Sequence, residues 1–324
     1  MSDSRPKLDI SVVIPLYNEQ DNVLLLNREL EAALSELAVS YEIVYVNDGS
    51  QDDTLPLLRE IARKDARIKV ISFTRNFGQT AAISAGFRHS RGEIVVTLDG
   101  DLQNSPKDIG LLLEKMNEGY DVVSGWRRKR KDPFLSRRLP SMAANALISK
   151  ITGVRLHDYG CTLKAYRRHI VGNLNLYGEM HRFIPALAGW LGASIAEIEV
   201  THAPRKFGKS KYGFDRTFRV ILDLINVKFL ISYSTRPIQL FGKIGLYSFF
   251  LSLFSLGFVV WAKLTQGIKM ANNPLLFLSI LLVLVGVQFI TIGLLGEINI
   301  RTYHEAQGKP IYIIKEILND NPKP

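Results

Sequence analysis

Short apolar runs alternate with amphipathic stretches from Ile10 to Ser124. Runs of this length that are mostly apolar are typical of strands buried on both faces of a parallel sheet. Between them, apolar positions recur at helical spacing, as they do from Val23 to Leu37. Predicted strands cover 10–14, 41–46, 68–73, 94–98 and 120–124, and predicted helices cover 23–37 and 80–90, with another starting at Ser105. This alternation predicts βαβ units with right-handed crossovers, and therefore a Rossmann-like α/β fold with a mostly parallel sheet.

The pattern changes after Pro237, where nearly all of the long apolar runs lie. Residues 244–262 and 274–296 contain no charged side chain, and each segment is long enough to cross roughly 30 Å of hydrocarbon. Two such spans joined by a short loop predict a transmembrane hairpin. Just before it, one helical face is apolar and the other polar, which favours a helix lying in the membrane interface, although a buried soluble helix gives the same pattern. The apolar face is Phe218, Ile221, Leu222, Ile225 and Phe229, and the polar face is Arg216, Arg219, Asp223 and Asn226.

These patterns divide the chain into four regions. An α/β domain covers 1–213, an interfacial helix region covers 214–236, a transmembrane hairpin covers 237–298 and a tail covers 299–324. The tail segment Pro310–Ile314 alternates weakly, so it is a candidate strand that pairs with a second subunit in a homo-oligomer.

Composition narrows the cellular setting and the partners. The 324-residue chain carries a formal charge of +10, which favours nucleic acid, anionic lipid or phosphorylated small molecules as partners. Cys161 is its one cysteine, which excludes a disulfide framework and a cysteine-based metal site. The first apolar run, Ile10–Ile14, is too short for the core of a signal peptide. We therefore expect the α/β domain to be cytoplasmic.

Two carboxylates, Asp99 and Asp101, follow the fourth predicted strand and are separated by Gly100. In an open α/β sheet, ligands bind at the carboxyl ends of the strands. Carboxylates this close repel each other unless a cation lies between them, and Mg²⁺ is usually held by one or two carboxylates while substrate phosphates complete its shell. Gln103 could add a neutral oxygen. An ordinary turn after a strand also favours Asp and Gly, so the pair alone does not separate a metal site from a turn.

Two more predicted strands end in polar loops, which are Pro15–Glu19 and Asn47–Ser50. The carboxyls of Glu19 and Asp48 could accept hydrogen bonds from a base or a ribose, and Tyr17 offers a stacking face. Taken singly, Glu19 could be an acid favoured at a helix start, and Asp48 could belong to a simple turn. No G-x-G-x-x-G follows the first strand and no Walker A sequence occurs, which disfavours dehydrogenases and P-loop ATPases.

Together, Pro15-x-Tyr17-Asn18-Glu19, Asp48-Gly49-Ser50 and Asp99-x-Asp101 resemble the donor-binding motifs of family 2 glycosyltransferases with the A-type fold. Family loops often read Asp-Asp-Gly-Ser; this chain has Asn47 at the first position, and the second acid, Asp48, is the one expected to face the base. The resemblance implies a nucleotide-diphosphate sugar as donor and a divalent metal, Mg²⁺ or Mn²⁺. It implies donor contacts from Pro15, Tyr17, Glu19, Asp48, Asp99, Gly100 and Asp101, and metal contacts from Asp99, Asp101 and Gln103.

Basic residues gather in two loops after the fifth predicted strand. The first runs from Arg127 to Arg138 and the second from Arg205 to Lys211. Such runs occur in solvated loops and in nucleic-acid patches, but no aromatic platform is interleaved beyond Trp126 and no nucleic-acid-binding module is recognisable. We therefore expect a phosphate or anionic lipid headgroups rather than nucleic acid. Asp158, between turn formers, is either a turn-initiating residue or a base or orienting group that faces the acceptor.

With Asp158 and Arg127, the second loop makes the chain resemble the polyprenyl-phosphate branch of this family over essentially its whole length. That branch includes dolichyl-phosphate mannosyltransferases and GtrB-like bactoprenol-phosphate glucosyltransferases. The resemblance implies an inverting transfer of a hexose, with UDP-glucose as the expected donor, to the phosphate of an undecaprenyl-type polyprenol at a bacterial plasma membrane. It makes Asp158 and Asp101 the catalytic candidates. Candidates for binding the acceptor phosphate are Arg127, Arg137, Ser141, Arg205 and Lys211.

Two other functions fit the same fold. A glycan-extending membrane synthase would share the chemistry, but such enzymes usually carry Gln-x-x-Arg-Trp near Glu179–Pro185, and this chain does not. A non-catalytic scaffold or lipid transporter is the second alternative. Two spans without intramembrane charge make a poor transport path, and intact carboxylates argue against an inactive relative.

Overall fold

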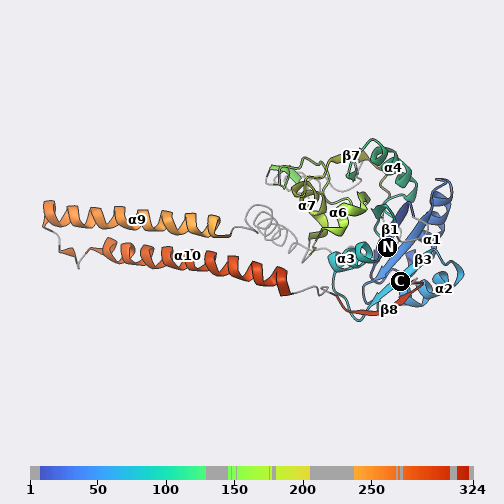
Figure 1. The fold of residues 1–324 in the computed structure, drawn as a ribbon, viewed down its shortest axis with the longest axis horizontal. Helices are drawn as coiled ribbons and strands as arrows, with labels where there is room; N and C mark the ends of the chain where they lie inside the picture. The colour runs from blue at the N-terminus through green and yellow to red at the C-terminus, as the bar shows by residue number, and fades with distance from the viewer. Residues whose placement is uncertain are drawn as a thin grey trace. The chain divides into compact units, whose positions relative to one another are not determined.

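The computed structural model describes residues 8–128, 145–146, 148–150, 152–174, 176, 180–204, 237–267, 269–270, 273–306 and 312–320 (Figure 1). The chain forms two compact units. The first, which we call the α/β unit, contains Met1–Val227 together with Pro310–Pro324, and the second, the hairpin unit, contains Lys228–Lys309. The predicted interfacial region, 214–236, lies outside the described residues.

The α/β unit is built on an eight-stranded sheet with the order β7-β5-β6-β4-β1-β2-β3-β8. All of these strands except β6 and β8 run in the direction of β1. The prediction of a Rossmann-like, mostly parallel α/β sheet is therefore confirmed. The strands are β1 Ile10–Leu16, β2 Tyr41–Asn47, β3 Ile68–Phe73, β4 Ile94–Thr97, β5 Val122–Trp126, β6 Lys164–Arg167, β7 Ile195–Glu199 and β8 Ile314–Leu318.

Helices cover both faces of the central strands, which explains why those strands are mostly apolar and almost wholly buried. One face packs against α1 Gln20–Ser35, α2 Thr54–Lys64 and α4 Ile109–Asn117, as in the cluster that joins Val12 to Leu26 and Leu112. The other face carries α3 Gln79–His89, where Gly86 lies directly on Val13 and leaves no room for a side chain. Figure 1 shows α3 across the sheet from α1 and α2. The remaining short elements of this unit are η1 Pro106–Asp108, α6 Arg168–Gly172, η3 Met180–Arg182 and α7 Ile184–Trp190.

The tail strand lies later in the chain than predicted and pairs within the chain. The sequence predicts a strand at Pro310–Ile314, paired with a second subunit, whereas β8 begins at Ile314 and pairs antiparallel with β3 of the same chain. The backbone N–H of Thr74 also donates to the carbonyl of Ile313 at 3.1 Å. The apolar alternation is genuine, but β3 offers an open strand edge within the same chain, and sequence alone does not show which edge a strand will find.

The hairpin unit consists of α9 Pro237–Gln266 and α10 Pro274–Ala306. Within them, Phe241–Gln266 and Pro274–Gly296 are long and apolar enough to cross a membrane. The two helices contact each other closely where Gly245 meets Gly286, because a side chain at either glycine would collide with the other helix. Ser252 donates to the carbonyl of Ser279 at 2.7 Å. Large apolar side chains such as Phe254 and Leu264 point outward, as lipid-facing residues do.

Candidate active site

The carboxyl ends of β1, β2 and β3 enclose a cavity of about 250 Å³, which we call the strand-end cavity. Its lining combines rings with polar groups and two cations. Tyr17 and Phe73 supply aromatic surface, and Arg75 lies at the end of β3. The full lining is Tyr17, Asn47, Gly49, Ser50, Gln51, Leu55, Ser72, Phe73, Thr74, Arg75, Asn76 and Lys315. Most of these residues are polar, so the cavity suits a polar ligand better than an apolar one.

The loops that follow β1 and β2 are hydrogen-bonded to each other. The N–H of Asn18 donates to Ser50 Oγ at 3.0 Å, and Asn18 Oδ1 accepts from the N–H of Gln51 at 2.9 Å. The N–H of Glu19 donates to Thr54 Oγ1 at 2.9 Å. Asn18 adopts a positive φ of 53°, a conformation that Asn tolerates better than most residues. These bonds hold the wall of the cavity in place without a charged pair.

Asp48 and Asn47 have different surroundings. Asp48 is buried, and its two carboxylate oxygens accept hydrogen bonds from the backbone N–H groups of Phe77 at 2.7 Å and Gly78 at 2.9 Å. Burial raises the pKa of Asp48, and these two bonds and Arg75 oppose the rise. Asn47, in contrast, lines the cavity, and its Nδ2 donates to Ser72 Oγ at 3.0 Å. The contact of Asp48 with the base stays a prediction; the structure gives it the further role of fixing the loop that carries Arg75.

Asp99 and Asp101 lie just beyond the end of β4. Asp99 Oδ1 accepts from Gln79 Nε2 at 2.8 Å, and Asp101 Oδ1 accepts from the N–H of Gln103 at 3.2 Å. Burial, and after it the negative charge of Asp101, raise the pKa of Asp99 to about 6. The residue between them is close to Leu16, so a side chain at Gly100 would collide with the end of β1. This packing joins the carboxylate turn to the same sheet edge as the strand-end cavity.

The two carboxylates fit a divalent cation. The charge of Asp101 disfavours the charged form of Asp99, and a cation between the two carboxylates would remove that cost. Among the residues that the structure describes, no group of three or more His, Cys, Asp and Glu side chains could enclose a metal. That donor set suits Mg²⁺ or Mn²⁺ completed by phosphate oxygens better than an ion held by protein alone.

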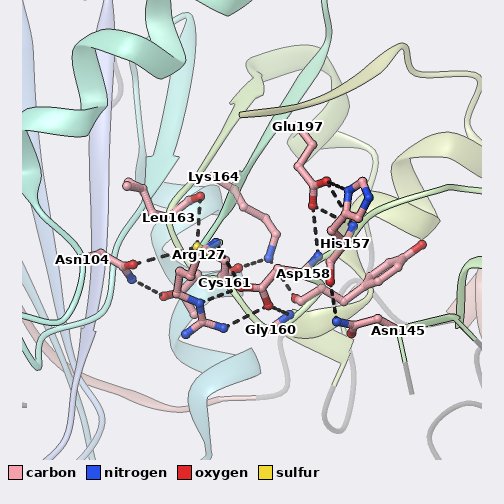
Figure 2. A network of polar contacts seen from close by, with 12 residues as sticks. Asn104, Arg127, Asn145, His157, Asp158, Gly160, Cys161, Leu163, Lys164 and Glu197 are labelled. Atoms are coloured by element: carbon pink, nitrogen blue, oxygen red, sulfur yellow. Dashed lines mark hydrogen bonds and ion pairs between the residues drawn. The ribbon is translucent and has the colours of Figure 1, made fainter. Parts of the chain in front are cut away.

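A buried ion pair, shown in Figure 2, joins Asp158 to Arg127, whose charge also interacts with that of Asp99. Arg127 Nε donates to Asp158 Oδ2 at 2.8 Å and Arg127 Nη2 donates to Asp158 Oδ1 at 3.0 Å, so both carboxylate oxygens contact the guanidinium. The two side chains are only 10% and 4% exposed. The backbone N–H of Asp158 donates to Glu197 Oε1 at 3.0 Å. This geometry supports Asp158 as an orienting partner of Arg127.

Lys164 is a second buried cation in this region, at the start of β6. Its ammonium group donates to the carbonyl oxygens of Tyr159 and Cys161, as Figure 2 shows. Burial lowers the pKa of Lys164, while the nearby charges of Asp158 and Asp99 favour its protonated form. We call Asp99, Asp101, Arg127, Asp158 and Lys164 the charged cluster.

The structure brings several predicted site residues to one sheet edge, namely Pro15, Tyr17, Glu19, Asp48, Asp99, Gly100, Asp101, Gln103, Arg127 and Asp158. Four predicted acceptor residues, Arg137, Ser141, Arg205 and Lys211, lie outside the described residues. Sequence reasoning missed Gln79, Arg75, Lys164 and Lys315. The residue types glutamine, arginine and lysine do not by themselves mark a functional site. Gln79 and Arg75 do lie within a few residues of a predicted helix start or strand end, where site residues gather.

Comparison of the sequence with known proteins agrees with the family resemblance described above. Residues 11–174 match the model of "Glycosyl transferase family 2". The chain is 43% identical to dodecaprenyl-phosphate galacturonate synthase of Rhizobium johnstonii, over 98% of this chain and 96% of that protein. It is 40% identical to undecaprenyl-phosphate 4-deoxy-4-formamido-L-arabinose transferase of Klebsiella pneumoniae, over 97% of this chain and 94% of that protein.

Among solved structures, the fold is similar to that of glucosyl-3-phosphoglycerate synthase from Mycobacterium tuberculosis, crystallised with Mn²⁺, uridine diphosphate and phosphoglyceric acid. The TM-score is 0.52 and the identity is 20%, and the match covers 70% of this chain and 81% of that chain. At this identity the likeness supports the fold.

Proposed function

Because the chain belongs to glycosyltransferase family 2, we propose that it transfers a sugar from a nucleotide-diphosphate sugar to the phosphate of a membrane polyprenol. One observation carries this proposal. The strand-end cavity and the turn with Asp99 and Asp101 lie at the same edge of the sheet, where a nucleoside and its diphosphate could bind side by side. Relatives named for polyprenyl-phosphate products cover nearly the whole chain, which supports the lipid acceptor.

We assign the diphosphate end of the donor to the turn after β4. Asp99, Asp101 and Gln103 would hold a divalent metal, which when bound supplies positive charge opposite the departing diphosphate. Gln79 donates a hydrogen bond to one oxygen of Asp99 and so orients that carboxylate. Gly100 keeps the turn close to Leu16 and hence close to the end of β1.

We assign the acceptor phosphate to the part of the charged cluster that contains Arg127 and Asp158. The phosphate is already anionic near neutral pH, because the second pKa of a phosphate monoester is about 6. A strong base is therefore less necessary than for a sugar hydroxyl, which agrees with an Asp158 held by Arg127. Together with Arg137, Ser141, Arg205 and Lys211, Arg127 would align the phosphate for an inverting displacement at the anomeric carbon.

The hairpin would hold the enzyme at the membrane that contains such an acceptor. A polyprenyl phosphate does not leave the bilayer, and Phe241–Gln266 and Pro274–Gly296 are suited to span it. We propose that both flanks of the hairpin, and with them the α/β unit, face the cytoplasm of a bacterial cell. No nucleic acid enters this proposal.

The test uses the full-length protein with radiolabelled donor, undecaprenyl phosphate and Mg²⁺ or Mn²⁺. We expect label in the organic-extractable lipid, and loss of that label on chelation with its return on adding back the metal. UDP-glucose is the sequence-based expectation for the donor; because two relatives are named for galacturonate and formamido-arabinose, the matching uridine-diphosphate sugars are compared with it. Label in no lipid product with any of the three, beside an active relative, would refute the proposal. Chains of several sugars would favour a glycan-extending synthase.

A further inference from the structure

The last strand of the chain contributes to the strand-end cavity. Lys315 of β8 belongs to its lining, although more than two hundred residues separate it from the other lining residues. The chain reaches this position only after the hairpin unit, and returns there to the α/β unit. The lining of the strand-end cavity is therefore not complete within the segment that matches the family model, residues 11–174.

The pairing of β8 with β3 explains how Lys315 reaches the cavity. Ser72 pairs with Glu316 and Phe73 pairs with Ile314, so the register shifts and Lys315 is left outside the ladder. A bulge of this kind turns a side chain away from the regular alternation and is frequent beside active sites. Because Ser72, Phe73 and Thr74 line the same cavity, the bulge lies at its wall.

Contacts on both sides of Lys315 hold the bulge in place. Before it, Tyr312 is buried and stacks on Phe73, with ring centroids 5.0 Å apart. After it, Glu316 forms an ion pair with Arg59 of α2 at 2.5 Å. Farther along, Asn319 Nδ2 donates to the carbonyl of Ala62 at 2.6 Å. These anchors use the neighbours of Lys315, which is itself exposed and belongs to the lining of the cavity.

We propose that Lys315 is a donor-binding residue whose ammonium group binds an oxygen of the nucleoside half of the nucleotide-diphosphate sugar. The proposal rests on the proposed function for the identity of the ligand. The cavity, at about 250 Å³, is smaller than the roughly 300–1,000 Å³ of sites for whole drug-sized ligands, so it suits part of the donor. Carbonyl and hydroxyl oxygens of a nucleoside accept hydrogen bonds, and Lys315 is a charged donor beside them.

A consequence is that donor binding and docking of the tail strand favour each other. A ligand that binds only when β8 is docked stabilises the docked state by mass action. Bound nucleotide should therefore slow hydrogen exchange in residues 312–320, and that protection should depend on the side chain of Lys315.

The binding test measures the Kd of UDP and of GDP for the purified full-length protein by calorimetry. We expect Lys315→Met to weaken binding of the preferred nucleotide about fivefold to tenfold, the range for loss of one partly exposed charged hydrogen bond. Lys315→Arg should restore most of the affinity, and wild type should lose more affinity than Lys315→Met as salt is raised. The matched control is Lys64→Met, the same substitution at an exposed α2 lysine that pairs with Glu60 and does not line the cavity.

The outcomes separate this inference from the proposed function. An unchanged Kd in Lys315→Met, or an equal loss in Lys64→Met, would overturn the role of Lys315. Weaker binding together with a lower unfolding midpoint and no rescue by Arg would make Lys315 structural, which also overturns it. If wild type binds neither nucleotide, the inference fails with its premise. Nucleotide binding that depends on Lys315, without any labelled lipid product, would leave the inference standing and refute the proposed acceptor.

Discussion

The strand-end cavity and the charged cluster occupy neighbouring positions on one sheet edge, but different interactions hold them. Between the loops after β1 and β2, and between β2 and β3, the cavity is shaped by hydrogen bonds that join neutral groups, such as Asn18 with Ser50 and Asn47 with Ser72. The charged cluster is buried, and its order depends on opposite charges, above all Arg127 with Asp158. The cavity therefore depends mainly on the shape of its wall, whereas the charged cluster depends on the balance of its positive and negative charges.

This difference predicts how each region responds to change. A neutral hydrogen bond contributes about 0.5–1.5 kcal/mol net. Each single substitution in the cavity should therefore weaken ligand binding only modestly. Removing one partner of a buried ion pair costs about 3–5 kcal/mol. A single substitution in the charged cluster should therefore destabilise the fold strongly. The division suits the proposed chemistry, because the donor's nucleoside must bind and leave, whereas the groups around the reacting phosphates must stay fixed.

The largest effect is expected for Asp101→Asn, which removes one negative charge from the proposed metal site and keeps the size of the side chain. We expect turnover to fall by about 10²–10³-fold, the usual loss when one group that stabilises developing charge is removed. The measurement is formation of labelled lipid at saturating donor and metal. Asp21→Asn, at an exposed position on α1, is the matched control and should keep the wild-type rate. A wild-type rate in Asp101→Asn would remove the metal from the mechanism.

The next effect concerns stability and compares two adjacent arginines. Arg127→Met removes the guanidinium that contacts both oxygens of the buried Asp158, and we expect the free energy of unfolding to fall by about 3–5 kcal/mol. Arg128→Met breaks an exposed pair with Glu199 and should cost no more than about 1 kcal/mol. Urea unfolding of both variants gives the two values. Equal losses would mean that the charged cluster is not the buried unit described above.

A smaller and more selective effect is expected for Asp48→Ala. The change leaves the N–H groups of Phe77 and Gly78 without their acceptor and loosens the loop that carries Arg75. We expect the KM for the donor to rise about tenfold with a smaller change in kcat, equivalent to about 1.4 kcal/mol of binding. Asp53→Ala, an N-cap residue of α2 whose side chain makes no capping hydrogen bond, is the control for steady-state kinetics. A loss confined to kcat would place Asp48 with the charged cluster instead.

In both regions, the sequence predicts the residues that directly follow an apolar run better than it predicts the others. Strand ends follow directly from apolar runs, so Tyr17 and Asp99 can be placed on one edge from the sequence alone. Lys164 cannot be placed in this way, because a lysine in a strand is normally read as a solvent-facing residue, and here it is 2% exposed. Its burial depends on the carbonyls of Tyr159 and Cys161, which come together only in the folded loop.

The tail shows a second limit of sequence reasoning. Weak alternation near Ile313 indicates a strand, but it does not predict the pairing with β3, because pairing between distant strands has no local signal. Pairing with a second subunit stays a prediction. The register shift that places Lys315 at the cavity is also a property of two strands together. Neither β3 nor β8 has a residue at this register shift that would mark it in the sequence.

The smallest effect should come from alkylation of Cys161, which tests whether the charged cluster is closed while the cavity is open. Burial raises the pKa of the Cys161 thiol to about 11. At pH 8 this reduces the reactive thiolate more than about a hundredfold relative to a thiol with a pKa of 8.5. Iodoacetamide at pH 8 should therefore leave native turnover unchanged, while it labels Cys161 fully in guanidinium chloride. Gln51→Cys, on the exposed wall of the cavity, should react in the native protein. Mass spectrometry of the peptides measures both sites, and native labelling of Cys161 as fast as that of the Gln51→Cys thiol would show that the two regions are equally open.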